Sequence, residues 1–235
     1  QRSLVGSEMC IRDRAISIMS DSDLKQLNFP QTISDSSIKG IILVEICDKV
    51  VCDALSQFNL PIVSVDMPNV PFEELNGIDV VTMESKKNLK KIINQLIEKG
   101  AESFGFVGDL YSPNVSRGFQ ERYNALSECL AEHQLPLNQK NCLLHQTPED
   151  FRNFQTTVNN LQAMISLPDV FICGNDWTAI QLIYALQFLG FQIPKDICVV
   201  GFDNIPAASR ISPSLTTIST PPVSYTHLTL PTIRL

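Results

Sequence analysis

Short runs of consecutive apolar residues alternate along the chain with longer segments in which apolar residues recur every three or four positions. The runs are rich in β-branched side chains, which is typical of parallel strands covered on both faces. They predict strands at residues 15–19, 41–44, 62–65, 80–82, 104–107, 142–145, 170–173 and 198–201.

The segments between these runs have the periodicity of helices. Residues 84–100 and 116–133 each carry one apolar stripe at the spacing of a single helical face. Residues 175–190 are apolar on more than one face and predict a well-buried helix that begins at Asn175 or Asp176. Alternating strands and helices predict an α/β fold of the doubly wound type, with right-handed crossovers.

Polar residues stand where several predicted strands end. The stretch "PIVSVD" ends in Asp66, "VFICGND" ends in Asn175 and Asp176, and "VVGFDN" ends in Asp203 and Asn204. In open α/β sheets, ligands bind beyond the carboxyl ends of the strands. Carboxylate and amide groups there can hydrogen-bond hydroxyl groups, which is how polar, uncharged ligands such as sugars are held.

Each of these residues also has a purely structural interpretation. Asp176 can cap its own helix, and Asn204 can form a turn before Pro206. No helix directly follows Asp66 or Asp203, so a ligand role is favoured for these two. Trp177, the only tryptophan, can stack on a sugar ring, but its apolar helix favours burial in the core.

Composition narrows the class of protein. The chain has 235 residues, 44% of them hydrophobic, with a net charge of −7 and an isoelectric point near 4.9. This balance argues against a nucleic-acid or anionic-membrane surface, because phosphate binding depends on clustered Lys and Arg. No apolar stretch is long enough to span a membrane.

The seven cysteines form no CxxC pair. Cys47, Cys142, Cys173 and Cys198 lie in or beside apolar strand runs, so we interpret them as reduced core residues, which favours a cytoplasmic protein.

The two ends of the chain lack the periodicity of the rest. Residues 1–14 and 221–235 resemble translated sequencing-adapter read-through, although native loops or tails are the alternative. We therefore expect both to be non-native tails that form no strand of either sheet.

A long C-terminal stretch resembles a known family. The sequences "VFICGNDWTAIQLIYALQFLGFQIPKDICVVGFDNIP" and "GFDNIPAASRISPSLTTI" are similar to the effector-binding domain of the LacI/GalR family of bacterial transcription regulators. The stretches "SIKGIILV", "LPIVSVD" and "ERYNALSECLAEHQLPL" resemble its earlier strands and its arginine-bearing helix. The resemblance covers about residues 15–220.

The resemblance implies two doubly wound, parallel-sheet lobes around a cleft, with the first lobe incomplete. The N-terminal lobe is then expected at 15–80 with a returning segment at 213–220, and the C-terminal lobe at 81–212. The residues implied to line the effector cleft are Asp66, Arg122, Asn175 and Asp203.

The sequence departs from the family pattern at Ala125-Leu126 and at Gly100-Ala101, which loosens any inference about which effector binds. The family's helix-turn-helix headpiece is absent from these residues, so DNA binding is expected only of the parent protein. A homodimer that senses a sugar-like effector, with no cofactor, metal or membrane contact, is implied.

Two other classes remain open. A periplasmic sugar-binding protein of an uptake system shares the two-lobed fold, although the "SPSLTTI" stretch and the cysteines favour the regulator. A doubly wound enzyme finds little support, because there is no G-x-S-x-G, P-loop, H-E-x-x-H or G-x-G-x-x-G motif. The three histidines are too scattered to assemble a metal site or a catalytic triad.

Overall fold

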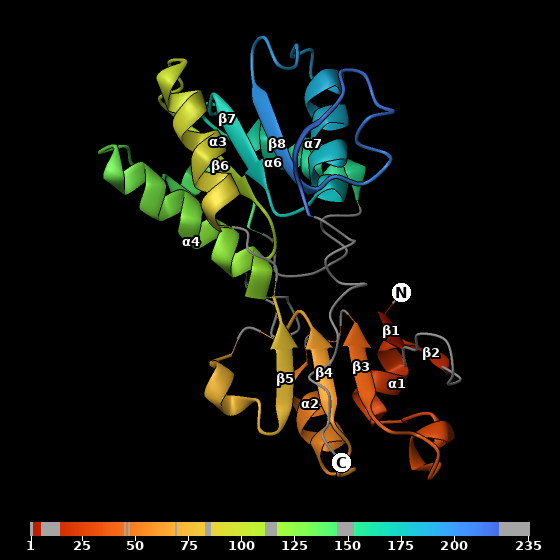
Figure 1. Ribbon diagram of the computed structural model, residues 1–235. Helices are drawn as coiled ribbons and strands as arrows, with labels where there is room; N and C mark the ends of the chain where they lie inside the picture. Colours follow the sequence, from red (N-terminus) through yellow and green to blue (C-terminus); the bar gives the residue numbers. More distant parts are fainter. Residues whose placement is uncertain are drawn as a thin grey trace. The chain divides into compact units, whose positions relative to one another are not determined.

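The computed structural model describes residues 2–5, 15–44, 46, 48–68, 70–82, 86–110, 117–144 and 153–220, with residues 2–5 described by their backbone alone. The chain divides into two compact units, each built around one β-sheet (Figure 1). The first unit comprises residues 1–87, 109–125 and 145–147, and the second comprises 88–108, 126–144 and 148–235. The α/β prediction is confirmed.

The sheet of the first unit has the order β2-β1-β3-β4-β5. Its strands β3, β4 and β5 pair in parallel, and their apolar side chains pack with those of α1 and α2 into one core. The elements are β1 (Arg2–Val5), β2 (Ile16–Met19), α1 (Asp21–Gln26), η1 (Gln31–Ser34), β3 (Ile41–Val44), α2 (Lys49–Ser56), β4 (Ile62–Val65), η2 (Phe72–Glu74) and β5 (Ile78–Val81).

The prediction that residues 1–14 form no strand is wrong. Strand β1 lies between β2 and β3 and pairs antiparallel with both. The physical reason is that the backbone groups on the facing edges of β2 and β3 need hydrogen-bond partners, and an extended segment of any sequence can supply them. Residues 6–14 and 221–235 lie outside the described part of the chain.

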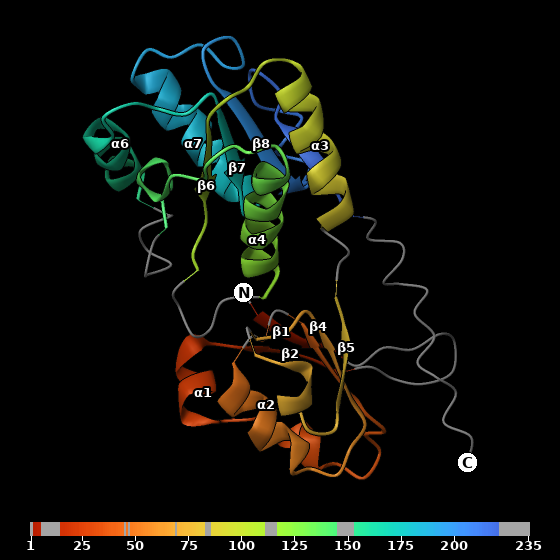
Figure 2. The ribbon, with the colours of Figure 1, turned by 90° about the vertical axis from the view of Figure 1, so that its left-hand side faces the viewer.

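The second sheet has the order β6-β7-β8-β9, with every pair parallel. Figures 1 and 2 show it between α3 and α4 on one side and α6 and α7 on the other. The elements are α3 (Lys86–Glu98), β6 (Phe104–Val107), α4 (Arg117–Glu132), η3 (Gln139–Asn141), α6 (Phe154–Ala163), β7 (Val170–Cys173), α7 (Asp176–Phe188), β8 (Cys198–Asp203) and β9 (Thr216–Ser219).

Two expectations for the second half of the chain are corrected. Residues 213–220 were expected to return to the first lobe, but Thr216–Ser219 form β9 beside β8, with Ile218 buried in the core of the second unit. The sequence predicts a strand at residues 142–145, but among the described residues 142–144 only Leu143 makes a bridge, to Val107, and residue 145 lies outside the described part of the chain. The 3-10 turn at Gln139–Asn141 directly precedes these residues, and pairing is made by Leu143, whose amide donates to the Phe106 carbonyl (2.8 Å) and whose carbonyl accepts from the Gly108 amide (3.1 Å).

The predicted helices are confirmed, and their ends follow local chemistry. Gly100 and Gly190 adopt φ values of +96° and +93° just after α3 and α7, a conformation that glycine reaches without steric cost. None of the helices that the structure describes is both long enough and apolar enough to cross a membrane.

Asp169 links the segments that lead into β6 and β7, the first two strands of the second sheet. Its Oδ2 accepts hydrogen bonds from the Ser103 amide (2.8 Å), the Ser103 hydroxyl (2.8 Å) and the Glu102 amide (3.0 Å). These contacts fix the residues that precede β6 to the residue that precedes β7. Burial disfavours the carboxylate, but these hydrogen bonds together lower the pKa of Asp169 below its ordinary value of 3.8.

A carboxyl group with a lowered pKa stabilises the fold above its unfolded-state pKa, and this stabilisation is lost as the pH falls through the folded-state value. We therefore expect Asp169→Asn to lower the free energy of unfolding modestly at pH 7, because the exposed side chain is screened by water. The difference from wild type should shrink below about pH 4. Urea unfolding at pH 7 and pH 3 checks this, and an equal difference at both pH values would contradict it.

Candidate functional site

Asp66 follows β4 and adopts a backbone conformation that is uncommon for a residue with a side chain. Its φ is +71°, in the left-handed region. Three hydrogen bonds hold it there: its amide donates to the Val81 carbonyl (2.9 Å), the Ser64 hydroxyl donates to its carbonyl (2.6 Å), and the Met67 amide donates to its Oδ1 (2.8 Å). Its side chain is half-buried.

Asp203 is the last residue of β8 and shows the same feature. Its φ is +108°, and Asn204 follows with +55°. The Thr220 hydroxyl donates to the Asp203 carbonyl (3.3 Å), and the Asn204 amide donates to the Thr217 hydroxyl (3.2 Å). Uncommon backbone conformations are found preferentially at binding sites, where the surrounding structure has to maintain them.

Asn175 lies two residues beyond β7 and caps α7. Its Oδ1 accepts from the Thr178 amide (2.9 Å) and the Thr178 hydroxyl (2.8 Å). The cap therefore belongs to Asn175, and the interpretation of Asp176 as the cap is wrong. A side chain with one amide oxygen in the cap can still present its NH₂ group to a ligand.

Asp176 has a structural role. It is fully buried, and its carboxylate accepts from the Thr217 hydroxyl (2.6 Å) and the Ile205 amide (2.8 Å). These bonds tie the first residue of α7 to β9 and to the turn after β8. Because that turn begins at Asp203 and Asn204, Asp176 positions the end of β8.

Arg122 lies on α4 and is 4% exposed, so it is not the solvated surface residue that its helix position suggests. Its guanidinium carbon is 5.7 Å from the centre of the Phe119 ring, within the range of a cation–π contact. The residue has further interaction partners, while its Nε makes no hydrogen bond to the described residues. A buried guanidinium can donate paired hydrogen bonds to adjacent hydroxyl groups or to a carboxylate.

The structure thus places the predicted site residues in two pairs. Asn175 and Asp203 lie at the carboxyl ends of the neighbouring parallel strands β7 and β8, in the second unit. Asp66 and Arg122 both belong to the first unit. That all four bind one ligand remains a prediction.

A further acidic residue, Asp109, lies at a strand end and was not predicted as a site residue. Asp109 follows β6 in the stretch "FVGD" and is 3% exposed. Its signal is the same as that of Asp66, an acid just beyond an apolar run, and it could have been found on that basis.

The expectation that Trp177 is buried is wrong, because the side chain is 66% exposed. Helix α7 is apolar on almost every face, so periodicity did not indicate which face meets the core.

The described cysteines offer no reactive thiolate. Cys52, Cys129, Cys142, Cys173 and Cys198 are unpaired thiols. Burial raises the pKa of each of these thiols, that of Cys52 to about 11. Cys142 and Cys198 are only partly buried, and Cys47 lies outside the described residues. No group of His, Cys, Asp and Glu suited to a metal ion occurs in the described part of the chain.

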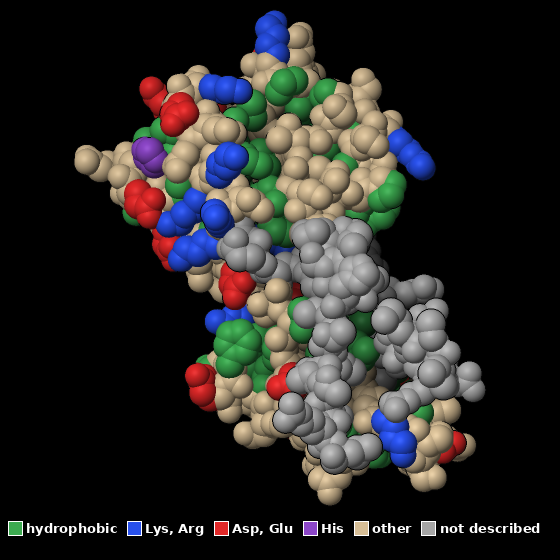
Figure 3. Space-filling model, in the orientation of Figure 1, with side chains coloured by type: hydrophobic (Ala, Val, Ile, Leu, Met, Phe, Trp, Pro, Cys, Tyr) green, Lys and Arg blue, Asp and Glu red, His purple; other side chains and the backbone are tan. Residues whose placement is uncertain are grey.

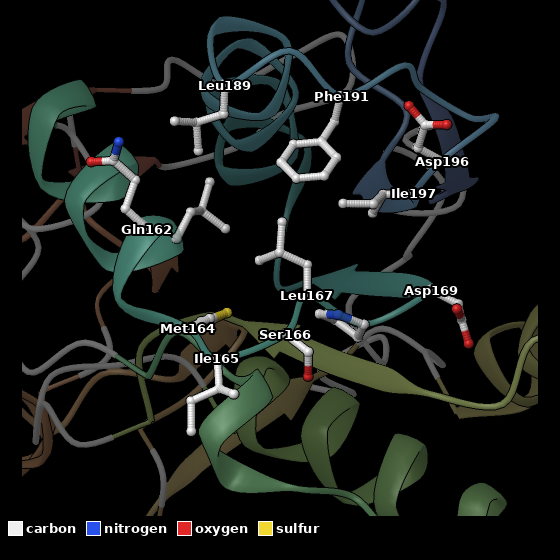
Figure 4. A pocket seen from close by; sticks show the side chains of 12 residues that line it. Gln162, Met164, Ile165, Ser166, Leu167, Asp169, Leu189, Phe191, Asp196 and Ile197 are labelled. Carbon is white, nitrogen blue, oxygen red and sulfur yellow. The ribbon is translucent and has the colours of Figure 1, made fainter.

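A separate hollow of about 480 Å³ lies at the opposite end of the second sheet, near the starts of β7 and β8 (Figure 4). Its wall is mostly apolar and includes Met164, Leu167 and Phe191. Its polar lining consists of Gln162, Ser166, Asp169 and Asp196, and the two carboxylates accept hydrogen bonds from backbone amides. None of its lining residues follows the carboxyl end of a strand, which is where ligands bind in open α/β sheets.

The chain is similar to known proteins over most of its length. Residues 93–230 match the family described as a periplasmic binding protein-like domain. Catabolite control protein A of Staphylococcus xylosus is 29% identical over 87% of this chain and 60% of its own length. The ribose operon repressor of Haemophilus influenzae is 26% identical over 86% of this chain and 58% of its own length. The chain thus spans about three-fifths of these relatives.

A solved structure shares the fold. The LacI family transcriptional regulator from Lactobacillus casei with bound glucose superposes with a TM-score of 0.65 at 21% identity, covering 83% of this chain and 71% of that one. The family resemblance predicted from the sequence is confirmed.

Asn175 allows its capping role to be separated from a ligand role. We expect Asn175→Ala to destabilise the fold by about 1 kcal/mol through loss of the cap, and to weaken ligand binding as well. Asn175→Asp keeps a capping oxygen and should leave stability nearly unchanged, yet it loses the NH₂ donor and should weaken binding. Urea unfolding and calorimetric sugar titration of both variants check this. Full binding by Asn175→Asp would restrict the residue to capping.

Proposed function

Because the chain belongs to the periplasmic binding protein-like domain family, we propose that it is the effector-binding domain of a LacI/GalR-type transcription regulator. We propose further that its effector is a neutral, sugar-like molecule or a nucleoside. The observation that carries this proposal is the pair of aspartates, Asp66 and Asp203, that end parallel strands with positive φ. The glucose bound to the Lactobacillus casei regulator supports a sugar as the ligand class.

In this proposal, Asp66, Arg122, Asn175 and Asp203 bind one effector together. Each carboxylate accepts hydrogen bonds from two ligand hydroxyls, Arg122 donates a parallel pair, and the Asn175 NH₂ group donates one more. The effector changes the populations of the protein's conformations only to the extent that it binds one conformation more tightly than another.

If the chain is part of a transcription regulator, as we propose, the parent protein binds operator DNA. The net charge of −7 supports the proposal that these residues do not contact DNA themselves. The lysines of α3 do not form an isolated basic patch, because Lys90 pairs with Glu132 (2.7 Å) and Glu128 (3.4 Å) of α4. Figure 3 shows Lys and Arg side chains on this side of the second unit interspersed with Asp and Glu.

The described cysteines favour the regulator over a periplasmic sugar-binding protein. Unpaired thiols persist in a reducing compartment, which supports the cytoplasm as the location. The relatives, named as a control protein and a repressor, and the raised pKa values of the thiols support binding rather than catalysis.

We expect Asp203→Ala to weaken binding of the best sugar or nucleoside about a hundredfold or more. The reason is that two hydrogen bonds to a charged group, each worth about 1.5 to 3 kcal/mol, are lost. Calorimetric titration with a panel of mono- and disaccharides and nucleosides measures the effect. Asp79→Ala, which removes an exposed carboxylate from β5, serves as the control. Equal affinity of wild type and Asp203→Ala would exclude this role for Asp203.

We propose that the chain pairs with a second copy through α6 and α7. Helices α3 and α4 carry many charged residues, as solvent-facing helices do, whereas α6 has none and α7 has only the fully buried Asp176. The uncharged face exposes Trp177 (66%), Tyr184 (47%), Phe188 (68%) and Phe154 (39%). Because two copies of a chain with a net charge of −7 repel each other, an uncharged aromatic face is where they can meet.

We expect Phe188→Asp to shift the dimer to monomer at micromolar concentration, because it places a charge in the interface; truncation of a dominant interface residue costs about 2 kcal/mol or more. Because the side chain is 68% exposed, the variant should still fold. Ile165→Asp, at a position that is 96% exposed outside α6 and α7, is the matched control. Sedimentation velocity checks this, and dimers that persist in Phe188→Asp would contradict the proposed surface.

A further inference from the structure

Arg117, the first residue of α4, contacts the segment that follows Asp66. Its amide donates to the Met67 carbonyl (3.1 Å), and its Nη1 donates to the Val70 carbonyl (3.0 Å). Its guanidinium carbon is 4.6 Å from the centre of the Phe72 ring. The backbone and side chain of Arg117 therefore contact Met67, Val70 and Phe72. Residues 67–72 and Arg117 all belong to the first unit.

The guanidinium is itself oriented by its helix. Its Nε donates to Glu121 Oε1 (2.9 Å), one turn further along α4. With Nε paired to Glu121 and Nη1 paired to Val70, the planar group has little rotational freedom, and its face is left for the Phe72 ring. The three donors of a lysine all lie on one nitrogen, so a lysine cannot reproduce the separated, planar donors that Arg117 directs at Glu121 and Val70.

These contacts join two residues that the proposed function places around the effector. Met67, whose carbonyl Arg117 binds, donates its own amide to Asp66 Oδ1 (2.8 Å). Arg122 lies five residues after Arg117 on the same helix. An α-helix rises about 1.5 Å per residue and is stiff over such a length. Fixing Arg117 to Met67 therefore fixes Asp66 relative to Arg122.

We propose that Arg117 is a positioning residue for the effector site: it locks the end of β4 to the first turn of α4 and so sets the separation of Asp66 from Arg122. The proposal rests on the proposed function, in which these two residues bind the same molecule. Arg117 does not touch the effector. Its influence on binding passes through the Met67 carbonyl and the Asp66 side chain.

The test compares Arg117→Ala and Arg117→Lys with wild type in two measurements. Hydrogen exchange without ligand follows the amides of Asp66, Met67, Val70 and Phe72, and calorimetric titration uses D-glucose as the probe. Arg210→Ala, which removes an exposed arginine in the turn after β8, is the control for loss of one positive charge. Urea unfolding of all variants separates local from global effects.

We expect exchange at Asp66 and Met67 to become several-fold faster in Arg117→Ala, and glucose affinity to fall about tenfold. Arg117→Lys keeps the charge near Phe72 and one donor, so it should recover part of both losses. The urea midpoint of Arg117→Ala should stay close to that of wild type, whereas loss of a residue that only stabilises the fold would lower it. Arg210→Ala should match wild type in every measurement.

Unchanged exchange at Asp66, Met67, Val70 and Phe72 in Arg117→Ala would overturn the proposal, and so would faster exchange with unchanged glucose affinity. If wild type binds no glucose, the sugar proposal fails for that ligand, while the exchange comparison still decides whether Arg117 holds the segment. If Arg117→Ala does not fold, Arg117→Lys provides the same comparison.

Discussion

The backbone at the carboxyl ends of parallel strands has to turn away from the sheet, and in this protein two of those turns occur at aspartates with positive φ. A residue with a side chain is held in that region only when its surroundings supply enough hydrogen bonds. At Asp66 these come from Ser64, Met67 and Val81, and the turn beyond Asp203 is held by Asp176 and Thr217. Both aspartates end strands whose apolar side chains build the two cores, so the packing of each unit positions its own half of the proposed site.

Elements with a clear period were predictable from the sequence. The strands at residues 41–44, 62–65, 104–107 and 170–173 and the helices α3, α4 and α7 appear where the pattern places them. Strands that depend on pairing with a neighbouring strand were not predictable from the sequence. Strand β9 is mostly polar and becomes a strand only because β8 offers it an edge, and β1 fills the gap between β2 and β3. The exposure of Trp177 was not predictable, because α7 has no polar side that would indicate which of its faces is exposed to solvent.

The strand ends that carry the residues of the proposed site were predictable from the sequence, but the contacts that support those residues were not. A polar residue after an apolar run marked Asp66, Asn175 and Asp203, and the same signal was present for Asp109. The burial of Arg122 and the cap made by Asn175 depend on tertiary packing and on which of two adjacent residues has extended backbone. Arg117 has no motif, since its role comes from contacts with residues 67–72, which are distant in sequence.

We propose that residues ending strands in both units bind one neutral ligand. The decisive experiment is an NMR titration of the labelled chain with a saturating neutral sugar. We expect the largest shifts of amide signals to occur together at Asp66 and Met67 in the first unit and at Asn175 and Asp203 in the second. Shifts confined to one of these units, or to the hollow beside Met164 and Phe191, would contradict it.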